Sequence, residues 1–114
     1  MSQDTIAAIE KEIAASKELV EYGNAVERLR SNRDFKKVIV EGYFEKESIR
    51  LVHLLANPAM QTPTSQSAIL VAMQAIGNLS QYLIDAVRTG EIALKQIGDN
   101  ESVRDELLAE ELAE

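Results

Sequence analysis

From residue 51 to residue 84 this chain contains no Asp, Glu, Lys or Arg, although these four residue types make up 27% of the whole sequence. The chain's only histidine, His53, lies in this charge-free segment. An apolar surface of such extent associates when it is exposed, so the segment has to be covered. The rest of the chain, further copies of the chain, or a partner must provide that cover.

The length and composition restrict the class of protein. With 114 residues there is room for one domain, whose core is aliphatic because only 4% of the residues are aromatic. Cysteine is absent, which excludes disulfides, thiolate nucleophiles and Cys-ligated metals and fits an intracellular protein. The polar, acidic residues 1–5 do not resemble a secretory signal.

Apolar residues recur at spacings of three and four, which predicts helices throughout. A first helix is expected over residues 5–30, with Gly23-Asn24 marking a kink or a close helix approach. The residues expected on its apolar stripe are Ile6, Ile9, Ile13, Val20, Tyr22, Val26 and Leu29. Ser31, with Asp34 three residues later, is the expected cap of a second helix that ends at Asn57-Pro58. The apolar positions expected to share one face of that second helix are Phe35, Val38, Ile39, Gly42, Tyr43, Ile49, Val52 and Leu55.

Thr62-Pro63 predicts the start of a third helix, with threonine as the cap and proline at the first helical position. The apolar pattern continues for about 35 residues, or about 50 Å at 1.5 Å per residue, so we expect a bend or break near Gly90. Gly98, followed by Asp99 and Asn100, is the expected end of this helix, before a short last helix through Leu112.

These elements predict an all-α fold, an elongated helical hairpin or bundle of three to four helices with a short acidic C-terminal helix. We expect residues 1–98 to form the helical bundle domain and residues 99–114 the acidic C-terminal tail. The residues expected in the core or in a subunit interface are Ile69, Met73, Ile76, Leu79 and Leu83. The third helix also includes Val87, Leu94 and Ile97 among its apolar positions.

Membrane insertion is not expected. A spanning helix needs about 20 consecutive apolar residues, whereas polar and turn-forming residues occupy 57–67 and the apolar run 68–76 is short. A buried helical hairpin explains the charge-free segment instead.

Most of the negative charge lies at the C-terminal end. Residues 99–114 hold seven carboxylates and Arg104, and so contribute minus six of the total net charge of minus seven. One interpretation is a solvated helix that aids solubility. The other is an acidic docking helix that binds a neighbouring subunit or partner through the apolar side chains of Val103, Leu107, Leu108 and Leu112.

Positive charge gathers at the junction of the first two helices, on Arg28, Arg30, Arg33, Lys36 and Lys37. Nucleic-acid binding would need a wider basic face and interleaved aromatic residues, so we do not expect it. A solvated turn, or a receptor for the acidic tail of an adjacent copy, explains these residues better, and such a receptor would make assembly depend on salt.

No catalytic constellation is evident, and we expect neither an enzyme, a cofactor nor a metal site. His53 lies among apolar neighbours, which favours a packed or interface residue over a catalytic one. Glu41 and Glu45 are one helical turn apart, but the Glu-x-x-His pattern of carboxylate-bridged metal bundles is missing. There is also no glycine-rich phosphate loop, nucleotide fingerprint or zinc spacing.

Four stretches carry a resemblance to a known group of proteins: residues 34–44 (DFKKVIVEGYF), 50–63 (RLVHLLANPAMQTP), 75–83 (AIGNLSQYL) and 106–112 (ELLAEEL). They resemble small, acidic, all-helical proteins encoded among the virion and head-assembly genes of tailed bacteriophages. The resemblance covers about residues 20–112. It implies a non-enzymatic structural or assembly role, in the host cytoplasm or the virion, with other virion or assembly proteins as partners.

We therefore expect a phage-type structural or assembly protein that acts through homo-oligomerisation, without binding a membrane. Small residues in the charge-free segment, such as Ala68, Ala72, Ala75 and Gly77, suit close packing of repeated copies. The alternative is a small acidic regulator that inhibits a host protein by imitating the charge of nucleic acid. Such a mimic would spread its carboxylates over an extended face. A DNA-recognition subunit of the small-terminase kind is a third possibility, which the modest basic patch disfavours.

Overall fold

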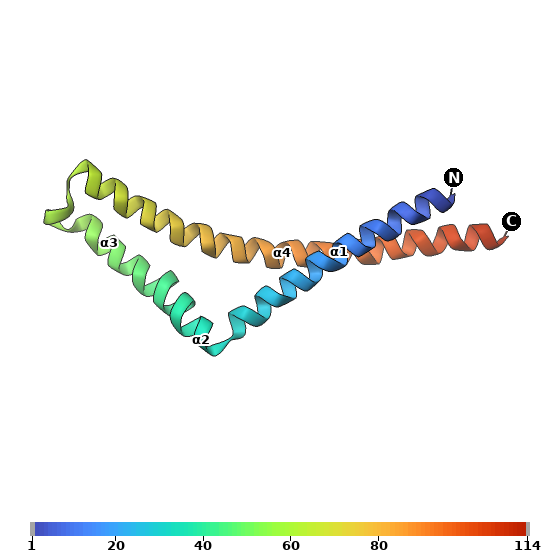
Figure 1. The fold of residues 1–114 in the computed structure, drawn as a ribbon, viewed down its shortest axis with the longest axis horizontal. Helices are drawn as coiled ribbons and strands as arrows, with labels where there is room; N and C mark the ends of the chain where they lie inside the picture. The colour runs from blue at the N-terminus through green and yellow to red at the C-terminus, as the bar shows by residue number, and fades with distance from the viewer. Residues whose placement is uncertain (1, 114) are drawn as a thin grey trace. The chain divides into compact units, whose positions relative to one another are not determined.

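The computed structural model describes residues 2–113, and these residues are almost entirely helical, with no strand among them (Figure 1). The expected all-α class is confirmed. The elements are α1 (Ser2–Ser31), the short α2 (Arg33–Phe35), the π-helix η1 (Lys36–Glu47), α3 (Ser48–Ala56), the 3₁₀ turn η2 (Pro58–Met60) and α4 (Pro63–Ala113).

The chain forms two compact units. One unit contains the described part of residues 1–26 and 85–114, which is most of α1 and the C-terminal part of α4. The other contains residues 27–84, from the end of α1 to the middle of α4. Each unit is a pairing of helical segments, and each is described separately below.

In the unit formed by residues 27–84, the chain reverses direction between α3 and α4, as the sequence predicts. The carboxamide oxygen of Asn57 accepts a hydrogen bond from the backbone N–H of Ala59 (2.9 Å), and Thr62 Oγ1 accepts one from the N–H of Ser65 (3.1 Å). The predicted end of the helix at Asn57-Pro58 and the predicted threonine cap are therefore confirmed. The side-chain amide of Gln66 closes the turn by donating to the carbonyl oxygens of Leu55 (3.1 Å) and Met60 (2.8 Å).

The core of this unit joins α3 to the first turns of α4. Leu51, Ile69 and Ile76 are each about 95% buried and form one cluster. Half-buried apolar side chains pack around it from η1, α3, the turn and α4: Tyr43, Phe44, Leu54, Leu55, Met60, Ala72 and Met73.

The π-helix η1 changes which face of the second helical segment is buried. Hydrogen bonds from residue i to i+5 give each turn about one more residue than in an α-helix. The half-buried positions accordingly fall at Phe35, Ile39, Val40, Tyr43 and Phe44. The expectation of one α-helical stripe is wrong for three of its members, because this wider turn shifts them off the buried face: Val38, Ile49 and Val52 are 61%, 58% and 52% exposed.

The helix α4 is continuous for 51 residues, so the predicted break near Gly90 and the predicted end at Gly98 are wrong. Gly90 lies inside the continuous helix and faces α1, where a Cβ would be 3.3 Å from the Cα of Gly23, so its missing side chain is needed for packing. Asp99 and Asn100 do not cap a new helix but lie within α4. The predicted acidic tail is the last part of α4 up to Ala113, while Glu114 lies outside the described residues. A separate domain at 99–114 stays a prediction.

One face of α4 is buried along nearly its whole length. Every seventh residue from position 69 to position 97 is buried, and we call these residues the buried stripe: Ile69, Ile76, Leu83, Gly90 and Ile97. A strict seven-residue repeat keeps an apolar line facing a partner helix, as in coiled coils. The stripe packs in unit 27–84 through its first residues and faces α1 through its last ones.

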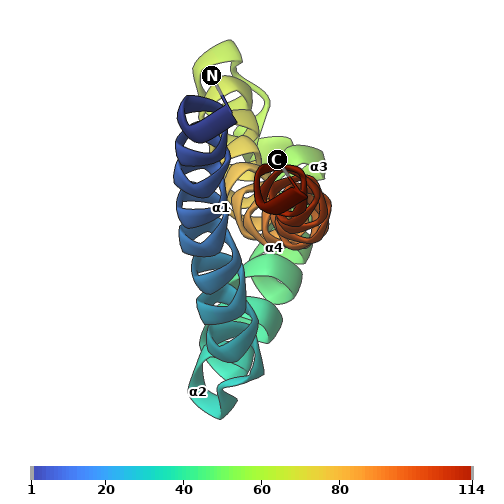
Figure 2. The ribbon, with the colours of Figure 1, turned by 90° about the vertical axis from the view of Figure 1, so that its right-hand side faces the viewer.

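In the other unit, α1 and the C-terminal part of α4 run antiparallel and side by side (Figures 1 and 2). Gly23 lies against Gly90 and Ala86, while Glu12 meets Asn100, whose Nδ2 is 3.4 Å from Glu12 Oε2. A Cβ built on Gly23 would lie 3.3 Å from the Cα of Gly90 and 3.2 Å from the carbonyl oxygen of Ala86. Of the two readings of Gly23-Asn24, the close helix approach is therefore correct.

The face of α1 that meets α4 is only partly apolar. Ile6, Ile13 and Val26 are buried as expected, but Ser16 is buried too. Ile9 and Val20 are half-buried, and Tyr22, expected in the same stripe, is 50% exposed. Small side chains thus replace large ones where the two backbones come closest.

Replacing Gly90 by leucine should destabilise the protein. The Cβ of the new side chain would lie about 3.3 Å from backbone atoms of Leu19 and Gly23, which leaves no room for the rest of it. We expect a loss of about 1–3 kcal/mol in the free energy of unfolding, the usual cost of overpacking. The measurement is thermal and urea unfolding followed by circular dichroism.

Gly98→Leu is the matched control on the same helix, since a Cβ at Gly98 meets nothing within 4 Å. There leucine should be neutral or stabilise by up to about 1 kcal/mol, because glycine is a poor helix former. Equal effects of the two substitutions would contradict the close contact of α1 with α4.

The helical segment that begins at Arg33 is capped by Asn32 and not by Ser31. Asn32 Oδ1 accepts hydrogen bonds from the backbone N–H groups of Asp34 and Phe35, both at 3.0 Å. Ser31 remains in α1, where its hydroxyl donates to the carbonyl oxygen of Glu27 (3.0 Å). The prediction of Ser31 as the cap is wrong by one residue, because α1 extends to Ser31, one residue beyond its predicted end.

Asn32→Ala should therefore cost about 1 kcal/mol of stability, since two backbone donors lose their acceptor. Ser31→Ala should cost markedly less, as it removes only an exposed hydrogen bond within α1. Urea unfolding of the two variants measures the difference, and a larger loss for Ser31→Ala would overturn the assignment.

Candidate interaction surface

A second apolar stripe runs along α4 beside the buried one. Its members are spaced by three and four residues and all are exposed, and we call them the open stripe: Ala68, Val71, Ala75, Leu79 and Tyr82. Val71, Leu79 and Tyr82 are 61%, 38% and 57% exposed. This spacing places the five side chains on one side of the helix, where they offer a ridge for another helix.

The remaining face of the same part of α4 is polar but uncharged. Gln74, Asn78 and Gln81 are exposed and recur at spacings of four and three, which puts them together on the side away from the buried stripe. Asn78 lies seven residues after Val71, where the open stripe borders the amides, and the exposed Leu70 and Ile84 lie on the opposite flank. The helix thus has the buried stripe on one side, the open stripe beside it, and the amides on the side away from the buried stripe. A helix with this division buries two sides and keeps the third in contact with water.

One window of 18 residues within α4 is long and apolar enough, by length and composition, to cross a membrane. Its mean hydropathy is 1.3 and 17% of it is buried. The expectation that the apolar run is too short is thus wrong, because α4 continues past Ile76 without a charged residue before Asp85. One such helix is weak evidence for a membrane span, since the mostly buried core helix of a soluble protein meets the same criterion.

The predicted core or interface residues of α4 divide between the two stripes. Ile69, Ile76 and Leu83 belong to the buried stripe and are 4%, 5% and 7% exposed. Met73 is half-buried against the core of unit 27–84. Leu79 is not in the core but in the open stripe, so its role in an interface stays a prediction.

The basic residues lie at the end of α1 and the start of the next helical segment. Arg33, Lys36 and Lys37 line one surface groove of about 450 Å³ together with Ser31 and Glu41. Within residues 2–113 no ion pair involves any cation of the basic segment, which is the set Arg28, Arg30, Arg33, Lys36 and Lys37.

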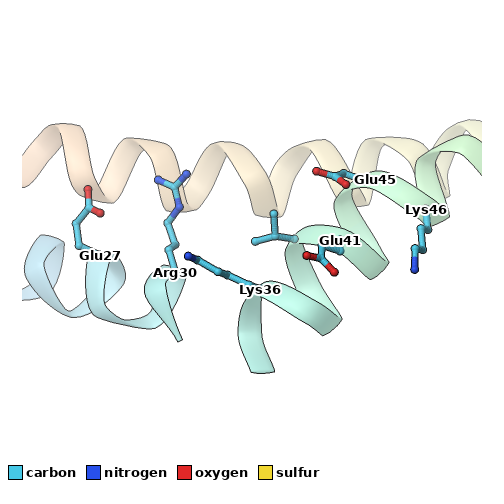
Figure 3. Close-up of a pocket in the computed structure, with 7 residues that line it drawn as sticks. Glu27, Arg30, Lys36, Glu41, Glu45 and Lys46 are labelled. Atoms are coloured by element: carbon cyan, nitrogen blue, oxygen red, sulfur yellow. The ribbon is translucent and has the colours of Figure 1, made fainter. Parts of the chain in front are cut away.

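A neighbouring groove of about 570 Å³ has mixed charge (Figure 3). Arg30, Lys36 and Lys46 face it, as do Glu27, Glu41 and Glu45, with Val40 as the apolar member. Three cations and three carboxylates balance there, so this groove has no net charge to attract an ion. The excess positive charge lies in the groove lined by Arg33, Lys36 and Lys37.

The acidic segment, residues 99–113, is helical throughout and packs on one side only. Asn100, Arg104 and Leu107 are half-buried, which indicates the side that faces α1. Of the predicted docking side chains, Val103, Leu108 and Leu112 are 45%, 40% and 88% exposed, while Leu107 is half-buried. Asp99, Glu106 and Glu110 are exposed and share one face with Val103 at spacings of four, three and four.

The candidate chemical groups do not form a site. His53 is exposed in the last turn of α3, so it is not packed inside this chain, and its place in an interface stays a prediction. Over residues 2–113 no three His, Asp or Glu side chains are placed to hold a metal ion. Glu41 and Glu45 lie on the mixed-charge groove beside cations and not as an isolated pair (Figure 3).

The sequence reasoning missed the open stripe as a separate surface, and it missed Ser16 and Asn32. The signal for the stripe is present in the sequence, as the alternation of three and four from Ala68 to Tyr82 beside a seven-residue repeat from Ile69. Two alanines make this stripe look weak when only large apolar residues are counted.

No family model, curated protein or solved structure matches this chain.

Proposed function

We propose that this chain is a non-enzymatic structural or assembly protein, of the phage virion type that the sequence resemblance implies, and that it acts by homo-oligomerisation. The observation that carries the proposal is the open stripe of α4. It presents large apolar side chains to solvent within a segment that holds no charged residue. An uncovered apolar surface of this kind is typical of a protein-protein contact.

The spacing of the open stripe favours a helix as the group that covers it. Residues at alternating distances of three and four form the ridge that packs against a second helix. The alanines at 68 and 75 allow close approach, and the larger side chains at 71, 79 and 82 fill the space beside them. A second copy of the chain supplies a matching apolar, uncharged helix, and closed symmetric pairing of identical surfaces is the commonest form of assembly.

The polar face of α4 argues against a lipid environment. A membrane-spanning α4 would bring Gln74 and Asn78 into contact with hydrocarbon, where an amide without a hydrogen-bond partner costs several kcal/mol. In an assembly of helices these amides keep their contact with water. A soluble oligomer accounts for both the apolar and the polar sides.

Two glutamates on the open stripe should disrupt the assembly. Val71→Glu combined with Ala75→Glu places like charges in the proposed contact on both copies. We expect the dissociation constant of the oligomer to rise at least about 100-fold, equivalent to about 2.7 kcal/mol. Sedimentation equilibrium over a range of concentrations measures this change.

The double variant Ser67→Glu with Gln74→Glu is the matched control, because it adds the same charge to the exposed polar face in the same part of the helix. Its dissociation constant should stay within about threefold of the original protein's, since surface charges are screened by salt. An equal effect of both variants, or a monomeric original protein at about 100 µM, would refute the proposal.

A further inference from the structure

We infer that the acidic segment of one copy, residues 99–113, docks on the basic segment of a second copy. The groove lined by Arg33, Lys36 and Lys37 would receive the face formed by Asp99, Glu106 and Glu110. This inference rests on the proposed function, because it names a second contact between the same copies. It adds a contact between two different surfaces to the contact made by the open stripe.

The position of the basic residues in their helical segment is unfavourable when they are alone. Arg33 is the first residue after the cap, and Lys36 and Lys37 follow within about one turn. The start of a helix carries a partial positive charge, which repels cations and attracts anions. Asp34 offsets only one of the three charges. A carboxylate from outside would therefore be attracted both by the side chains and by the helix terminus.

The acidic residues are also placed unfavourably, because they lie near the C-terminal end of a helix. Glu110 lies in the last turn of α4, which contains no basic residue. The end of a helix carries a partial negative charge, which repels carboxylates. External cations would relieve this repulsion, so the two segments are complementary in side-chain charge and in helix polarity.

Apolar side chains accompany the charges on both segments. On the acidic side, Val103 lies on the same face as the three carboxylates and is 45% exposed. On the basic side, Leu29 and Val38 flank the cluster and are 46% and 61% exposed. A contact that combines charged pairs with apolar contact gains both directional attraction and buried area.

The partner is a second copy because the chain carries both halves of the contact and leaves both open. No ion pair within the described residues involves any cation of the basic segment, or Asp99, Glu106 or Glu110. In the acidic segment, Arg104 pairs at 3.4 Å with its neighbour Asp105, which is not a member of the proposed docking face. Contact between two different surfaces adds copies in a head-to-tail manner and forms a ring or a filament.

A charge-exchange experiment tests the inference. One chain carries Arg33→Glu, Lys36→Glu and Lys37→Glu, and a second carries Asp99→Lys, Glu106→Lys and Glu110→Lys. Each chain alone should assemble at least about tenfold more weakly than the original protein at about 50 mM salt, in sedimentation velocity. An equal mixture of the two should recover assembly, since each variant surface then faces its complement. The original assembly should weaken at about 500 mM salt.

Three exposed lysines outside the basic segment provide the matched control. Lys11→Glu, Lys17→Glu and Lys95→Glu change the net charge by the same amount as the basic-segment variant. Assembly of this control should change by no more than about threefold. Circular dichroism checks that all variants are helical, as expected for substitutions of exposed side chains.

Three outcomes would overturn the inference. Unchanged assembly of the charge-reversed chains would overturn it while leaving the proposed function intact. Failure of the mixture to recover assembly, together with a gel shift of duplex DNA that the basic-segment variant abolishes, would assign the cations to nucleic acid. An original protein that is monomeric at both salt concentrations would refute the proposed function, and the inference with it.

Discussion

The seven-residue repeat of buried side chains along α4 is the constraint on which the rest of the structure depends. Ile69 and Ile76 form the core of unit 27–84 with Leu51, and further along the same line Gly90 and Ile97 face α1. A break in α4 would end the repeat, because a bend changes which side of the helix faces its partner. The glycine that could have broken the helix instead meets Gly23, and this contact lets α1 approach closely.

The helix α4 packs one side against its own chain, and its other sides must face water or a partner. In the charge-free segment the neighbouring side is the open stripe, and the third side carries the amides of Gln74, Asn78 and Gln81. Neither side bears a formal charge, so the two sides differ little in net charge. They differ in the direction in which their side chains point from the helix. This difference is why we assign the open stripe to a partner helix and the amides to water.

Much of the secondary structure could be predicted, since caps and breakers act locally. The stop at Asn57-Pro58 and the cap at Thr62 depend on residues within one turn, and the structure confirms both. The role of Gly90 could not be predicted from the sequence. Whether a glycine breaks a helix or permits a close contact depends on a residue far away in the sequence, here Gly23. The exposure of Val38 likewise depends on the π-helical turn, for which apolar spacing gives no signal. The open stripe was partly predictable, as Leu79 was expected in a core or interface, but not as a surface distinct from the buried stripe.

The most direct test of the account is a cysteine scan of α4, which is unambiguous because the chain has no cysteine of its own. Single cysteines at positions 68, 71, 75, 79 and 82 would be compared with cysteines at 67, 74 and 81 for interchain disulfide formation under mild oxidation. The account predicts rapid cross-linking at positions of the open stripe and slow, concentration-dependent cross-linking on the amide face, since a disulfide needs Cα atoms within about 7 Å. Equal rates on both faces would contradict it.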